Sequence, residues 1–168
     1  MSLFSRENLL YFIKEAIWLT LTAMAIYAIL YPITSKLDFI YWKINVFFIF
    51  LTITYFRWSI TFRSLPFLRP SVLRFLLFTV NLSLFIYIMH NLQKFIGLAD
   101  NFYIEDFGFI KPNVFIYEDM KRELFDYLYN ELVFFGTGAL IVLSAFQLRL
   151  ILSYWQYYKH AASRMLED

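Results

Sequence analysis

Cysteine is absent from the 168 residues, and glycine and proline are scarce, with four of each. Without cysteine the chain forms no disulfide and offers no thiolate for catalysis, for an iron–sulfur cluster or for a cysteine-ligated zinc site. Charge is scarce as well, since Asp, Glu, Lys and Arg make up 17% of the residues and the formal net charge is only +2. So small a positive charge argues against a nucleic-acid partner.

Apolar residues are abundant instead. They make up 61% of the chain, with 21 Phe and 13 Tyr, and the mean hydropathy is +0.58. A soluble domain of this size has too little interior to bury so much apolar surface. Four stretches that are poor in charge come close to the roughly 20 residues that a helix needs to cross a hydrocarbon core of about 30 Å. The sequence therefore predicts an all-α integral membrane protein, a single four-helix bundle over residues 1–168 with spans at about 11–33, 39–60, 71–93 and 131–157.

The distribution of basic residues predicts the orientation of these spans. The connection between the second and third spans carries four arginines and no acid, namely Arg57, Arg63, Arg69 and Arg74. The positive-inside rule places such a connection in the cytoplasm, so both termini of a four-span chain are expected there too, in the plasma or inner membrane. The inverted orientation is the alternative. We expect the four arginines to contact anionic lipid headgroups, at about 1 kcal/mol each.

The connection between the third and fourth spans, residues 94–130, is expected on the external side. It is rich in aromatic residues, which is atypical of disordered segments. From about Tyr117 onwards, Leu124, Leu128 and Leu132 recur at helical spacing, which predicts an amphipathic helix lying at the membrane interface. We interpret this segment as an external cap, and we take Phe107 and Phe109 as candidate partner-docking residues.

The fourth span is followed by a sequence that keeps a helical composition, so we expect the helix to continue into the cytoplasm over residues 158–168. Trp155, at the end of the fourth span, and Tyr158 and Arg164, in this extension, are candidate partner-docking residues. Close packing between spans requires small residues, and buried polar residues require protein partners. The predicted helix-packing residues are Ala16, Thr20, Ala23, Asn45, Asn81, Gly138 and Ala145.

Few chemistries fit this composition. His90 is expected near the outer end of the third span and His160 beyond the inner end of the fourth, so the two cannot share a haem iron. No Asp or Glu falls in the central part of a predicted span, which argues against a carboxylate metal site or an ion relay. Phosphate-binding, dinucleotide-binding and zinc-protease motifs are absent from the sequence. We therefore predict no cofactor, no metal site and no enzyme activity.

Three functions remain as hypotheses. The first is a non-catalytic membrane-anchoring or membrane-sensing subunit of a larger complex, with the lipid bilayer, further membrane subunits and a cytoplasmic protein as candidate partners. The alternative is a homo-oligomeric small ion channel lined between subunits by Thr52, Asn81 or Ser83. The third is a lipid-modifying enzyme that uses Glu118, Asp119 and His90 at the outer interface, although one adjacent pair of acids is weak support for a metal site.

Overall fold

The structure, a computed structural model, describes residues 6–62, 71–99, 108–111 and 117–165. Helix dominates this part of the chain, as the sequence predicts. Its four helices and two short strands follow in the order α1 (Arg6–Thr34), β1 (Leu37–Phe39), α2 (Trp42–Ile60), α3 (Ser71–Ala99), β2 (Gly108–Ile110) and α4 (Glu118–Met165).

Three of the helices are long and apolar enough to cross a membrane. The stretches that meet this condition are Leu9–Thr34 in α1, Val72–Ala99 in α3 and Met120–Gln156 in α4. With 19 residues, α2 is about 28 Å long, and it carries Lys43 and Arg57 near its two ends. The three long helices indicate a membrane protein, whereas α2 as a fourth span stays a prediction.

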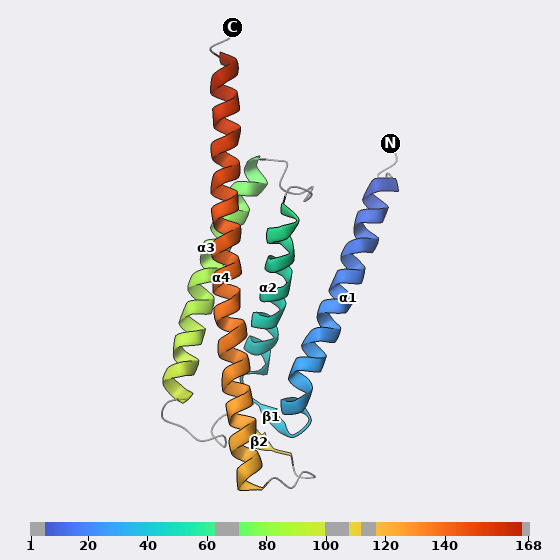
Figure 1. Cartoon of the computed structure of the whole chain (residues 1–168), viewed down its shortest axis with the longest axis vertical. Coiled ribbons are helices and arrows are strands. Elements are labelled where there is room, and N and C mark those ends of the chain that lie inside the picture. Colours follow the sequence, from blue (N-terminus) through green and yellow to red (C-terminus); the bar gives the residue numbers. More distant parts are fainter. Residues whose placement is uncertain (1–5, 63–70, 100–107, 112–116, 166–168) are drawn as a thin grey trace.

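The helices run alternately up and down (Figure 1). Helix α4 packs against α2 and α3, and α1 packs mainly against α2. Towards its N-terminal end α1 leans away from the other helices (Figure 1). The N-terminal end of α1 and the C-terminal end of α4 lie at the same end of the molecule, and the two strands lie at the other end (Figure 1). An alternating path of four helices accounts for this arrangement of the ends.

The core lies where α2, α3 and α4 meet. Phe48 of α2, Phe95 of α3 and Phe146 of α4 are completely buried in it. Phe146 is enclosed by rings from α2 and the residues that follow it: the centroids of Tyr55 and Phe62 lie 5.2 and 5.5 Å from its own, both edge-on. Each such aromatic pair contributes about 0.5–1.5 kcal/mol beyond area burial. These ring contacts help to hold α2 against α4.

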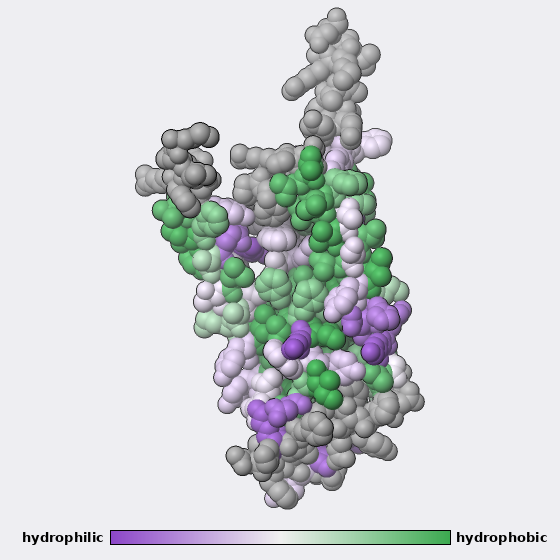
Figure 2. All heavy atoms as spheres, turned by 180° about the vertical axis from the view of Figure 1, so that it is seen from behind, coloured by the Kyte–Doolittle hydropathy of each residue, from purple (hydrophilic) through white to green (hydrophobic). Residues whose placement is uncertain are grey.

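The outward faces of the helices are largely apolar. Figure 2 shows hydrophobic residues covering much of the visible side of the molecule, and large side chains such as Phe75, Phe134 and Ile141 are exposed. Water-soluble proteins rarely expose apolar surface on this scale, whereas lipid-facing helices do so routinely. The surface therefore agrees with the membrane class that helix length indicates.

Strands β1 and β2 join two connections that are far apart in the sequence. They pair antiparallel, with Asp38 opposite Phe109. Just beyond the strands, the Lys111 backbone N–H donates to the Lys36 carbonyl at 3.1 Å, and Lys111 Nζ donates to the Thr34 carbonyl at 2.5 Å. The connection after α1 is thereby attached to the connection after α3, and we call this antiparallel pair of strands, Leu37–Phe39 and Gly108–Ile110, the hairpin.

Helix α4 differs from the expected combination of an interfacial helix and a separate span. It is one helix from Glu118 to Met165. Leu124, Leu128 and Leu132 are buried in the same cluster as Leu37 and Phe39 of β1. The prediction that this stripe faces the membrane surface is wrong, because the chain's own hairpin and helices cover it. The expected 94–130 connection is also shorter than predicted, since α3 extends to Ala99.

Candidate functional site

Polar side chains within the described residues gather in small groups between helices rather than in one metal-binding cluster. Among these residues no three His, Cys, Asp or Glu side chains lie close enough together to hold a metal ion. The polar groups between helices are therefore the candidates for function. Three of them join α1 to α2, α2 to α4, and α3 to α4.

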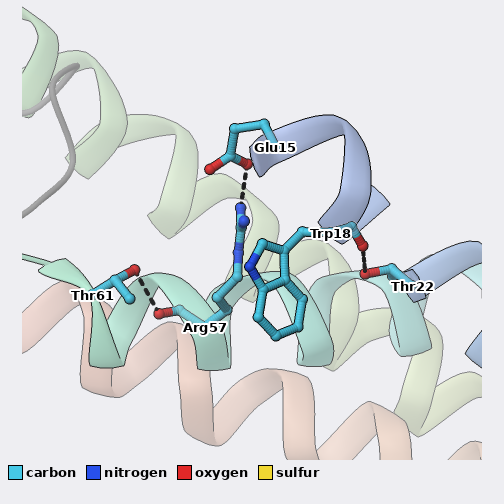
Figure 3. A network of polar contacts seen from close by, with 5 residues as sticks. All are labelled: Glu15, Trp18, Thr22, Arg57 and Thr61. Atoms are coloured by element: carbon cyan, nitrogen blue, oxygen red, sulfur yellow. Dashed lines mark hydrogen bonds and ion pairs between the residues drawn. The ribbon is translucent and has the colours of Figure 1, made fainter. Parts of the chain in front are cut away.

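The first group joins α1 to α2 and is drawn in Figure 3. Arg57 Nη2 donates to Glu15 Oε2 at 2.5 Å, and the side chains are only 14% and 24% exposed, respectively. The guanidinium also lies over the Trp18 ring, 5.6 Å from its centroid. A cation with a carboxylate on one side and an aromatic face on another is favourably placed in apolar surroundings. The group brings two opposite charges together and holds α1 to α2 far from the hairpin.

The second group joins α2 to α4 near the hairpin. Asn45 lies in the first turn of α2 and is completely buried, and Glu131 of α4 is only 7% exposed. Asn45 Nδ2 donates to Glu131 Oε2. The N-cap residue of α2, Tyr41, provides no side-chain hydrogen bond to the helix. A buried carboxyl group therefore lies against the start of a helix that has no side-chain cap.

The third group joins α3 to α4. Asn81 is almost completely buried, and its Nδ2 donates to the Leu143 carbonyl at 3.1 Å and to Gln147 Oε1 at 2.5 Å. Gln147 Nε2 in turn donates to the Phe78 carbonyl at 3.4 Å. Gln147 accepts from Asn81 Nδ2 and donates to the α3 backbone, whereas Asn81 Oδ1 is buried without a partner among the described residues. Both asparagines that the sequence predicts to face protein are therefore buried between helices.

Arginines occupy the end of the bundle opposite the hairpin. Arg74 Nη1 donates to Ser153 Oγ at 3.1 Å, and Arg149 donates to the Ser59 carbonyl. Together with the Arg57 contact to Glu15, these bonds give protein partners to both arginines of the predicted lipid-headgroup set that the structure describes. Arg63 and Arg69 lie outside the described residues, and a role in lipid binding stays a prediction for all four.

The predicted helix-packing residues fall into two classes. Ala16, Thr20 and Ala23 lie on an exposed face of α1, and Ala145 is exposed on α4, so packing against another helix stays a prediction for these four residues. Gly138 does face a neighbouring helix, because a Cβ built on it would lie 3.2 Å from Thr52 Cγ2. Helix α1 turns another face towards α2, the face that carries Glu15, Trp18 and Thr22.

Only part of the predicted docking set can be located. The Trp155 side chain is 72% exposed on α4. Phe109 lies in β2 with its backbone opposite Asp38. Phe107 and the side chains of Tyr158 and Arg164 lie outside the described residues. A role in partner docking stays a prediction for all five residues.

The residues named for the alternative functions are dispersed or already engaged. The Thr52 hydroxyl donates to the carbonyls of Phe48 and Phe135 at 2.9 Å each. Ser83 is exposed on α3, but its hydroxyl donates to the Thr79 carbonyl of its own helix. His90 is also exposed, and the side chains of Glu118 and Asp119 lie outside the described residues. Both alternative functions stay hypotheses.

Sequence reasoning missed Glu131, Glu15, Gln147 and Gly136. The sequence did contain an indication that Glu131 is buried. It follows Leu124 and Leu128 at the spacing of three and four residues that continues along the buried face of α4. Glu15 similarly belongs to the spacing that links Trp18 and Thr22. An ionisable residue in register with a buried stripe is a better indicator of a protein contact than of the end of a span.

The chain therefore belongs to the class of α-helical proteins, and three of its helices are long and apolar enough to cross a membrane. No protein-family model, curated protein or solved structure matches this chain.

Proposed function

We propose that this chain is a non-catalytic polytopic membrane protein that serves as an anchoring or sensing subunit of a larger complex. In this proposal α1, α2, α3 and α4 all cross the plasma or inner membrane, with both termini in the cytoplasm. The single observation that carries the docking role is the length of α4. Its 48 residues extend over about 72 Å, more than twice the roughly 30 Å thickness of a hydrocarbon core.

The surplus length lies on the side of the two termini. Helix α4 continues past the ends of the other helices there (Figure 1). From Ser153, which contacts Arg74 of α3, to Met165 the helix extends about 18 Å further. A helix that leaves its own bundle needs other contacts to be stable, because isolated short helices are marginal in water. A cytoplasmic partner would supply those contacts, and Trp155, exposed at the start of this extension, is a suitable anchor.

The test is purification of the tagged full-length chain from its own membrane in mild detergent, with determination of the mass and composition of the complex. A defined heteromeric complex is expected for the wild type, and Trp155→Ala should release the partner. Phe134→Ala is the matched control, since Phe134 is an exposed aromatic residue of α4 that lies 21 residues before Trp155, far from the extension. A homo-oligomer that contains no other protein would contradict the proposal and make ion conductance in a planar bilayer the next measurement.

A further inference from the structure

The contact between Glu131 and Asn45 leaves two hydrogen-bond acceptors without a donor. Asn45 Nδ2 donates to Glu131 Oε2, so each side chain keeps one further oxygen. Glu131 Oε1 and Asn45 Oδ1 are both buried, and neither has a hydrogen-bond partner among the described residues. Buried polar atoms in folded proteins are nearly always paired, so two unpaired oxygens on adjacent side chains require an explanation.

No positively charged side chain among the described residues explains the two unpaired oxygens. In this part of the chain Arg57 and Glu15 form the one ion pair within 4.0 Å, so no described Lys, Arg or His nitrogen lies that close to Glu131. Lys43, on the first turn of α2, lies over the Trp42 ring at 5.8 Å instead. Tyr127, one turn before Glu131, donates its hydroxyl to the Ile29 carbonyl of α1 at 2.9 Å. An ionised Glu131 would thus be a buried carboxylate without a cation.

A single hydrogen atom satisfies both oxygens. A carboxylic acid and a primary amide form two reciprocal hydrogen bonds: the amide N–H donates to one acid oxygen, and the acid O–H donates to the amide oxygen. The first of these bonds is present, between Asn45 Nδ2 and Glu131 Oε2. The two oxygens that remain are the ones that the second bond requires.

We propose that Glu131 and Asn45 form a proton-binding site, in which Glu131 carries a proton on Oε1 and donates it to Asn45 Oδ1. The proton comes from water, and its binding converts the carboxylate into a neutral acid. Its release removes one of the two hydrogen bonds between these two side chains and leaves a charge in the core beside Leu128 and Leu132, both completely buried. Proton occupancy is therefore coupled to the packing of α2 on α4. The site goes beyond the proposed subunit role and does not depend on any partner.

The competing possibility is an ionised Glu131. Helix N-termini favour nearby negative charge, and α2 begins beside this residue without a side-chain cap. In that case Glu131 acts as a fixed counter-charge for α2, and the Asn45 Oδ1 atom stays unpaired. The two possibilities differ in one chemical fact, the protonation state of the carboxyl group.

Infrared difference spectroscopy reads that state directly. Spectra of the purified full-length wild type and of Glu131→Gln are compared in detergent at neutral pH. The substitution is expected to remove a carboxylic-acid C=O band while leaving the carboxylate bands unchanged. Glu15→Gln is the control, and it should remove carboxylate intensity because Glu15 is paired with Arg57. Loss of carboxylate intensity in Glu131→Gln would overturn the proposal.

The stability of the same variant is a second criterion. A glutamine at position 131 can accept from Asn45 Nδ2 and donate to Asn45 Oδ1, so it reproduces both hydrogen bonds of the protonated pair. Glu131→Gln is therefore expected to fold and to unfold at the wild-type temperature. A variant that fails to fold, or that unfolds well below the wild type, would also contradict the proposal.

Discussion

At the scale of single residues, Gly136 allows α4 to approach α2 and α3 closely. A Cβ atom at this position would lie 2.8 Å from Leu92 Cδ1 of α3 and 3.0 Å from Phe48 Cε2 of α2. The Leu92 methyl group can rotate away, but the Phe48 ring is completely buried and has little room to move. The absence of a side chain at Gly136 thus allows three helices to meet at one level.

Gly136→Ala should therefore destabilise the protein. Overpacking a core by one methyl group costs about 1–3 kcal/mol, and the better helix propensity of alanine offsets about 1 kcal/mol of this. The expected net loss is about 1 kcal/mol, measured as a lower midpoint of thermal unfolding in detergent. Gly97→Ala is the matched control, because a Cβ there would meet no side chain of the described residues within 4 Å, and it should leave the midpoint unchanged or raise it.

Asn81 connects α3 to α4 by two hydrogen bonds, one to the backbone of Leu143 and one to Gln147. Asn81→Ala removes both donors and leaves Gln147 Oε1 without this partner. Interhelical hydrogen bonds of membrane proteins contribute about 0.6 kcal/mol on average and up to about 1.7 kcal/mol, so a loss of about 1 kcal/mol is expected. Asn91→Ala is the comparison, since Asn91 Nδ2 donates only within its own helix, to the Tyr87 carbonyl. Equal effects of the two substitutions would contradict an interhelical role for Asn81.

At the scale of elements, α1 is the least integrated of the long helices. Its buried apolar residues, Leu30 and Ile33, lie near its C-terminal end beside the hairpin. Nearer its N-terminal end, the contact that connects it to α2 is the Glu15–Arg57 pair with the Trp18 ring (Figure 3). The position of the first half of α1 therefore depends strongly on this one polar group.

A double-mutant cycle of Glu15→Gln and Arg57→Gln tests that dependence. Because both side chains are largely covered and the guanidinium is held by two groups, a coupling energy of about 1 kcal/mol is expected from thermal unfolding of the four proteins. Lys14→Gln, at the adjacent exposed position, should show no coupling with Arg57→Gln. Additive effects of Glu15→Gln and Arg57→Gln would mean that the pair does not hold α1 in place.

The helices can be predicted from the sequence, whereas the contacts between distant helices cannot. The long helices follow from the length and apolar composition of single segments, and the burial of Asn45 and Asn81 follows from the cost of exposing an amide to lipid. The partner of Asn45 lies 86 residues further along the chain, and only the folded arrangement brings it there. The same limit explains the error at Leu124, Leu128 and Leu132. A regular apolar stripe fits a membrane surface and a protein core equally well.

At the scale of the whole molecule, the positions of the ends favour an even number of crossings. The N-terminal end of α1 and the C-terminal end of α4 lie on the same side (Figure 1), and the connection between α2 and α3, rich in arginine, joins helix ends on that side. The arginines would be cytoplasmic under the positive-inside rule. We therefore predict cytoplasmic termini and an external hairpin.

Reversal of charge in that connection should disturb insertion. The double variant Arg63→Glu and Arg69→Glu removes two of the basic residues that would keep the connection in the cytoplasm. We expect a mixture of orientations or a marked loss of inserted protein, measured by protease protection of a C-terminal tag in membrane vesicles. Lys121→Glu with Arg122→Glu is the control in the connection predicted to be external, and it should insert normally. Normal orientation of the Arg63 and Arg69 double variant would show that these charges do not determine topology.

The central claim, four crossings with both termini in the cytoplasm, is tested most directly by single-cysteine labelling. The chain has no cysteine, so Ser2→Cys, Asp38→Cys and Ser64→Cys each introduce a unique thiol. When a membrane-impermeant maleimide is added to intact cells, only Asp38→Cys should be labelled. The other two should react only after the membrane is permeabilised. Labelling of Asp38→Cys and Ser64→Cys from the same side would contradict the account, because it would mean that α2 does not cross the membrane.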